Sequence, residues 1–128
     1  MKYLSNYIED GMSEVWKKHG VFFAFGKDQF NEQKKDGVKY YRVDGGMLCP
    51  QENFQAMEKD LVEVIKNGIA QDIAENGIDN IIKRELANHE AYYTGDIDST
   101  WSALTDYEGI TRGLVVAIFL EEKLTAEV

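Results

Sequence analysis

The pattern of apolar and polar residues divides the chain into a helical start, a short β-rich stretch and a long helical second half. From the N-terminus, apolar residues recur at steps of three and four. These residues are Tyr3, Leu4, Tyr7, Ile8, Met12, Val15 and Trp16. The spacing predicts an amphipathic helix that ends at Gly20. His19 follows Lys17 and Lys18 in the last turn, and we interpret it as a partner of the helix dipole rather than a ligand.

The next stretch has β-prone runs bounded by turn signals. It predicts a buried strand at Val21–Phe25, a second strand at Val38–Val43 after Asp36-Gly37, and a third, short strand at Gly46–Cys49 after the Asp44-Gly45-Gly46 break. Residues 26–35 form either a short helix or a loop. The glycine pair is not a phosphate-binding loop, because the spacing and the Lys of that motif are absent.

Helical spacing returns after Pro50. The predicted helices are Phe54–Ile65, ending at Asn67-Gly68; Ile69–Ile73, ending at Asn76-Gly77; Ile78–Leu86, with Asp79 as the N-cap; one holding Trp101 and Leu104, capped by Asp98, Ser99 or Thr100; and a last one capped by Thr111. The apolar run Leu114–Leu120 fits either a helix or a strand. The whole pattern predicts an α+β fold: a small antiparallel sheet of two or three strands, an N-terminal helix and a helical C-terminal half.

Size and cysteine content limit the possibilities further. A chain of 128 residues is about one domain, so we expect a single domain over residues 1–128. The one cysteine, Cys49, excludes an internal disulfide and suits a reducing cytosol; before Pro50 we interpret it as a buried structural thiol. No apolar run approaches the roughly 18 residues of a membrane span, so we expect a cytoplasmic protein with no membrane partner.

The charge is uneven along the chain. The net charge is −9; residues 1–64 contribute −2 and residues 65–128 contribute −7. This balance argues against nucleic acid as a direct ligand, because phosphate binding needs clustered Lys and Arg. It favours a protein partner with a basic surface, and we expect Asp72, Glu75 and Asp79 to contact that partner.

Residues 83–101 (KRELANHEAYYTGDIDSTW) gather the best candidates for a chemical site. His89 and Glu85 are four residues apart and share a helix face, and the other carboxylates nearby are Glu90, Asp96 and Asp98. An imidazole with several carboxylates can bind a divalent metal ion and support hydrolysis. In the competing interpretation, His89 lies at a helix end and the aspartates serve as turn and cap residues, and no cofactor is bound.

Four segments carry a family resemblance. GVFFAFGKDQFNE, GGMLCP, RELANHEAYYTGDID and LTDYEGIT, about a third of the chain, resemble segments of small uncharacterised proteins encoded by tailed phages and bacterial mobile elements. The resemblance implies an accessory protein that binds and blocks a host factor, including defence proteins that handle nucleic acid. It carries no catalytic residues.

Two functions therefore remain. The preferred hypothesis is a non-catalytic acidic interaction protein, and the alternative is a small metal-dependent hydrolase or metal-binding protein. A chain this rich in aromatic residues also suggests a possible homodimer through an exposed apolar patch.

Overall fold

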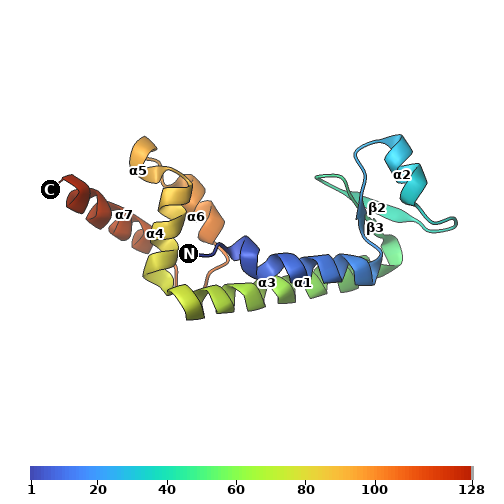
Figure 1. Ribbon diagram of the computed structural model, residues 1–128, viewed down its shortest axis with the longest axis horizontal. Coiled ribbons are helices and arrows are strands. Elements are labelled where there is room, and N and C mark those ends of the chain that lie inside the picture. Colours follow the sequence, from blue (N-terminus) through green and yellow to red (C-terminus); the bar gives the residue numbers. More distant parts are fainter. Residues whose placement is uncertain (128) are drawn as a thin grey trace. The chain divides into compact units, whose positions relative to one another are not determined.

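A computed structural model describes residues 1–127, with side chains to Leu124, and its elements are mainly helical around one small sheet (Figure 1). The elements in order are α1 (Leu4–His19), β1 (Phe22–Phe23), α2 (Lys27–Gln33), β2 (Tyr40–Val43), β3 (Met47–Pro50), a 3-10 turn (Gln51–Asn53), α3 (Phe54–Asn76), α4 (Ile78–Asn88), α5 (Ala91–Thr94), α6 (Asp98–Leu104) and α7 (Arg112–Glu127). The α+β prediction is confirmed. Among these helices, none combines the length and the apolar content of a membrane span.

The chain forms two compact units, each described here by itself. The N-terminal unit is Leu4–Gly68, and the C-terminal unit is Met1–Tyr3 with Ile69–Val128. A compact unit is not the same as an independently folding domain, so the single domain over residues 1–128 stays a prediction.

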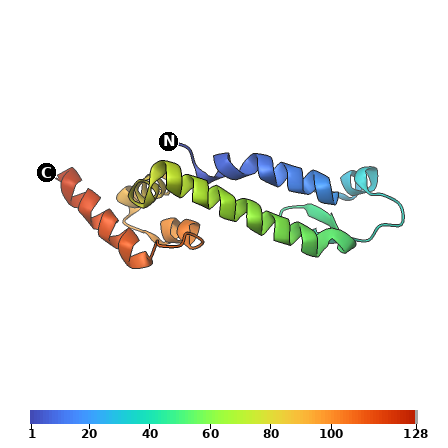
Figure 2. The ribbon, with the colours of Figure 1, turned by 90° about the horizontal axis from the view of Figure 1, so that it is seen from below.

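A pair of antiparallel helices forms the base of the N-terminal unit. Helix α1 lies beside the first part of α3 (Figures 1 and 2). The predicted end of α1 is confirmed, because Gly20 follows it with a φ of 72°, the left-handed conformation that ends many helices.

Two glycines allow these helices to approach closely. A Cβ atom at Gly68 would lie 2.2 Å from Ile8 Cγ2, and one at Gly11 would lie 2.9 Å from Val64 Cγ1. The predicted break at Asn67-Gly68 is therefore wrong: α3 continues through it to Asn76. Position 68 is occupied by glycine because α1 packs closely against α3 at that point. The gain from this packing outweighs the poor helix propensity of glycine, which costs roughly 1 kcal/mol relative to Ala.

The sheet has the strand order β1-β3-β2, and both pairings are antiparallel. Phe22 pairs with Leu48, and Val43 pairs with Met47 across the turn that holds Gly45 and Gly46. The three predicted strands are present. However, β1 has only two residues and is partly exposed, whereas a buried strand was predicted.

Helix α2 and the α1–α3 pair enclose the sheet from its two faces. Phe30 of α2 stacks on Phe22 and makes an edge contact with Tyr40. Next to the helix pair, Cys49 is fully buried in a core with Val15 and Met57. Cys49 is thus buried as predicted, and burial raises the pKa of its thiol above the usual value.

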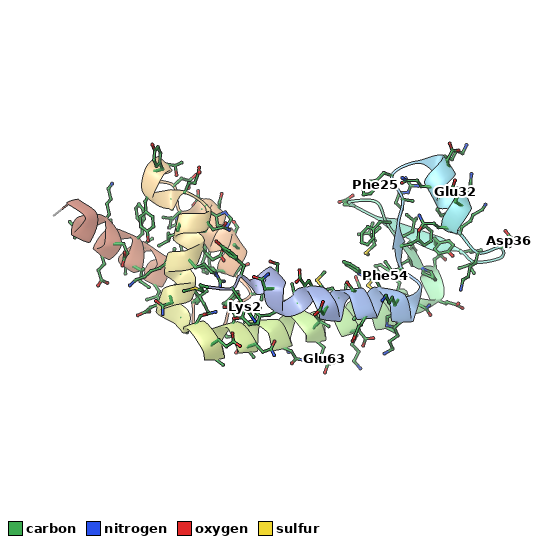
Figure 3. The ribbon with its side chains drawn as sticks, in the orientation of Figure 1. Lys2, Phe25, Glu32, Asp36, Phe54 and Glu63 are labelled. Atoms are coloured by element: carbon green, nitrogen blue, oxygen red, sulfur yellow. The ribbon has the colours of Figure 1, made fainter. Side chains whose placement is uncertain are left out.

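Phe25, by contrast, leaves the sheet. Its side chain is 77% exposed, although one edge of its ring lies against Gly46 in the β2–β3 turn (Figure 3). Phe23 is also exposed, with Trp16 against its ring. Within the Val21–Phe25 run, therefore, only Phe22 and Phe23 form a strand, at the edge of the sheet, and only Ala24 is buried.

Helix α4 is central in the C-terminal unit and contacts α5, α6 and α7. Its apolar face (Ile81, Ile82, Leu86) is completely buried. The predicted N-cap Asp79 is wrong, because α4 begins at Ile78 and its N-cap is Gly77 with a φ of 75°.

The last predicted helix is confirmed, and Leu114–Leu120 is helical rather than extended. Thr111 Oγ1 accepts a hydrogen bond of 3.1 Å from the backbone N–H of Leu114, as an N-cap side chain does. The start of α6 was predicted less well: its N-cap is Ile97, and Asp98, Ser99 and Thr100 lie inside the helix.

Candidate functional site

A buried carboxylate organises the polar interior of the C-terminal unit. Asp72 lies in the part of α3 that belongs to this unit, and its side chain is completely shielded from solvent. Arg84 of α4 donates to both of its oxygens, from Nη1 at 2.8 Å and from Nη2 at 3.0 Å. Tyr107 donates its hydroxyl at 2.5 Å, and Asn76 donates its amide at 2.8 Å. Every lone pair of this carboxylate therefore faces a donor.

Arg84 is held from several further directions. Its Nε donates to Glu85 Oε1 at 2.8 Å, and its Nη1 also donates to the backbone carbonyl of Lys2 at 3.0 Å. Lys2 is labelled in Figure 3. The guanidinium lies 5.6 Å from the centre of the Tyr3 ring, within cation–π range. These contacts attach Lys2 and Tyr3 to α4.

The charges of this cluster are fixed by its geometry. Burial alone would raise the pKa of the Asp72 carboxyl, but the three side chains that donate to it and the guanidinium charge outweigh burial and lower the pKa. Burial and the neighbouring carboxylate both raise the pKa of Tyr107 well above its ordinary value. Burial opposes the charge of Arg84, yet its two carboxylate partners raise the pKa of the guanidinium. The cluster is an ion pair with a neutral phenol.

Toward the surface, the cluster continues through Glu85 to His89, and both are among the predicted metal ligands. Glu85 is buried, and its Oε2 lies 3.4 Å from Nε2 of His89, whose side chain is 29% exposed. Asn88 donates to the same carboxylate oxygen at 3.5 Å. Buried Thr100 donates to the backbone carbonyl of Glu85 at 3.4 Å.

The other predicted metal ligands have different surroundings. Glu90 is exposed in the turn between α4 and α5, with a left-handed backbone (φ 55°). Asp96 accepts a 2.9 Å hydrogen bond from the backbone N–H of Asp98, and Asp98 forms an exposed ion pair of 3.2 Å with Arg112. Among the side chains that the structure describes, those of residues 1–124, no three from His, Cys, Asp or Glu are grouped so that they could hold a metal ion. Of the five predicted ligands, the structure brings only Glu85 and His89 into contact through their side chains.

The predicted partner-binding residues separate in the same way. Glu75 and Asp79 are exposed. Asp72 needs a correction, because a fully buried carboxylate paired with Arg84 is not part of any accessible surface. Sequence reasoning also missed Arg84 and Tyr107, the two strongest partners of Asp72.

A surface cluster around Lys83 lies close to Asp79. Lys83 forms an ion pair of 3.1 Å with Glu122 of α7. Its pKa is raised mainly by the hydrogen bond to Glu122 and further by the charges of Glu121 and Asp79. One exposed lysine therefore has three carboxylates around it, which makes this surface acidic.

The arrangement as a whole offers little chemical reactivity. The Asp72 cluster is buried and its donors are all engaged, so it has no group poised to attack a substrate. Its clear role is structural, since it ties α3, α4, Tyr107 and the chain start together. In the N-terminal unit, an open groove of 490 Å³ on α3 is lined by Gln55, Glu58, Lys59, Leu61, Val62 and Ile65, without a nucleophile beside a base.

Comparisons with known proteins give one match. A family model described as "Family of unknown function (DUF7659)" matches residues 4–125. No curated protein matches the chain, and neither does any solved structure. The match covers nearly the whole sequence and assigns no activity to it.

Proposed function

The chain belongs to DUF7659, a family of unknown function, and we propose that it is a non-catalytic interaction protein whose C-terminal unit binds a partner with a basic surface. The observation that carries this proposal is the charge of the exposed side chains of that unit. The exposed carboxylates are Glu75, Asp79, Glu90, Asp96, Asp98, Asp106, Glu108 and Glu121. The exposed basic residues are Lys2, Lys83, Arg112 and Lys123.

The surface of this unit is more acidic than the residue counts suggest, because most of its basic side chains already contact carboxylates. Lys83 and Arg112 each already contact a carboxylate, and the fifth basic residue of the unit, Arg84, is buried with Asp72 and Glu85. Such a surface attracts cationic proteins, accelerates their association and repels nucleic acid. The resemblance to phage and mobile-element proteins supports an accessory role in the bacterial cytoplasm. The partner would be a basic host protein of the class that handles nucleic acid. A metal-dependent hydrolase is not proposed, because no contact beyond that of Glu85 with His89 favours it.

The test is capture of basic proteins from a bacterial lysate by the immobilised chain, with quantitative mass spectrometry at several salt concentrations. The test variant carries Glu75→Gln and Asp79→Asn. The matched control carries Glu9→Gln and Asp10→Asn, which remove two exposed carboxylates from α1 in the N-terminal unit.

We expect a basic protein that the wild type and the control retain and the test variant loses. We also expect the captured amount to fall steadily as salt screens the charges. Capture that grows between low and moderate salt, or that is equal for all three proteins, would contradict the proposal.

A further inference from the structure

Helix α7 has apolar residues on two opposite faces. On the inner face, Val115, Ile118 and Phe119 are buried and the helix contacts α4 and α5. A second set of apolar or small residues follows steps of four, three and four: Gly113, Ala117, Leu120 and Leu124. With about 100° between successive helical residues, these four lie within a stripe of about 60°, opposite the buried face. We call this set the outer stripe.

The outer stripe is open to solvent. Leu120 is 51% exposed and Leu124 is 65% exposed, and both smaller members are also exposed. A surface helix normally carries polar residues on the face opposite its core contacts, and a helix that is apolar all round is usually covered. The steps of four, three and four are also those by which one helix packs along another. Gly113 and Ala117 leave space for large side chains of such a helix, and the two leucines project beside them.

From the outer stripe we infer that α7 is the docking site for an amphipathic helix of a partner protein, with an apolar face flanked by Lys or Arg. This inference rests on the proposed function and assigns it a surface. The partner helix would lay its apolar residues along the outer stripe, the mode by which amphipathic helices bind apolar grooves.

Charge complementarity selects a cationic partner helix over a second copy of this chain. Residues 65–128 carry a net charge of −7, so two copies would bring like charges together. Exposed Glu121 borders the outer stripe, whereas Glu122 lies on the inner side of α7, where it pairs with Lys83 of α4. The other border has Lys123, which lies 5.9 Å from the centre of the Phe119 ring. A helix with Lys or Arg beside its apolar face would place a cation against Glu121 while its leucines cover the outer stripe, on a unit whose net charge is negative.

The experiment uses a synthetic peptide of about 18 residues with Leu at helical spacing and Lys elsewhere, long enough to span α7. A scrambled peptide of the same composition has the same charge without the apolar face. Fluorescence anisotropy measures the affinity of both for the wild-type chain, for Leu120→Gln/Leu124→Gln and for Ala117→Lys. The control is Val62→Gln, which removes an equally exposed apolar side chain from α3. Circular dichroism confirms that each variant keeps its helices.

We expect the patterned peptide to bind the wild type and the Val62 variant at least about tenfold more tightly than the scrambled peptide. In both α7 variants, its affinity should fall to that of the scrambled peptide.

Other outcomes would overturn the inference. If both peptides bind the wild type and the α7 variants alike, and binding weakens in Glu75→Gln/Asp79→Asn, the acidic surface binds by charge alone; the docking site fails while the proposed function stands. Concentration-dependent dimers that Leu120→Gln/Leu124→Gln abolishes would show that a second copy covers the outer stripe. If neither peptide binds, α7 is not a site for cationic helices, and the lysate capture decides the proposed function separately.

Discussion

Replacement of Asp72 by Asn separates a structural role from a binding role. The substitution keeps the shape of the side chain but removes its charge, and it leaves the buried guanidinium of Arg84 with Glu85 as its remaining carboxylate partner. Removal of one partner from a buried ion pair costs about 3–5 kcal/mol, because the other charge stays buried. Since Glu85 still compensates part of that charge, we expect the low end of the range, a loss of about 3 kcal/mol.

The measurement is the free energy of unfolding in denaturant at neutral pH, followed by far-ultraviolet circular dichroism. Glu75→Gln is the matched control: it lies three residues away on the same helix but is exposed, so we expect a change within about 0.5 kcal/mol. A loss of less than about 1 kcal/mol in Asp72→Asn would refute the argument that this ion pair is a structural centre.

Acid titration tests the same reasoning independently. The folded-state pKa of Asp72 lies below its unfolded value, so its stabilisation is complete above the unfolded pKa and is lost as pH falls through both values. We expect the wild type to lose stability below about pH 5, and Asp72→Asn to lose less over the same range. Asp60, whose pKa the hydrogen bonds from His19 and Lys18 lower, acts in the same direction in both proteins. The diagnostic quantity is therefore the difference in slope; parallel acid profiles would contradict the assignment.

Three further substitutions test other contacts. Gly68→Ala places a methyl group 2.2 Å from a side-chain carbon of α1, so the free energy of unfolding should fall by about 1–3 kcal/mol although alanine favours helix more than glycine does. In the control Gly113→Ala, the new methyl group meets only an oxygen at 3.9 Å, and the protein should not be destabilised. Equal effects of the two substitutions would contradict the close approach of α1 and α3. Thr111→Val removes the cap of α7 and should lower the thermal midpoint, at a cost of about 1 kcal/mol, whereas Thr111→Ser should keep it. Tyr107→Phe removes one donor to Asp72 and should cost about 1–3 kcal/mol in denaturant unfolding; an unchanged midpoint would show that this hydrogen bond contributes nothing.

The sequence predicted the elements better than their boundaries, for identifiable physical reasons. Helical spacing identified α1 and α4, and Thr111 correctly marked the start of α7. The pattern failed at Gly68, because glycine is both a helix stop signal and the residue that permits close helix packing. Only the position of α1 in space distinguishes these uses, and sequence spacing does not contain it.

The candidate site was predicted in part. The contact between His89 and Glu85, one turn apart, is present, although His89 is the C-cap of α4 and not part of the helix; Arg84, the buried partner of Glu85, was missed. Asp72 and Tyr107 are 35 residues apart, so no local pattern joins them. A signal was present nevertheless: Asp72 lies three residues after Ile69, and Glu85 lies four residues after Ile81, so both carboxylates fall on apolar helix faces. A carboxylate in that place needs a buried donor, and Arg84 is the nearest arginine in sequence to both.

The same reasoning applies in reverse to α7. A carboxylate on an apolar face requires a buried cation, and Asp72 has one in Arg84. An apolar residue on a solvent face has no comparable requirement when it is single, but Leu120 and Leu124 lie one turn apart on the same exposed face. Two such leucines in line with Gly113 and Ala117 make a continuous apolar strip, bordered by Glu121, on a unit whose exposed side chains are mainly acidic. The two departures from the amphipathic pattern thus have different consequences. The buried carboxylate of Asp72 is neutralised within the C-terminal unit by Arg84, whereas the exposed leucines of α7 require a partner with its own apolar face and positive charge.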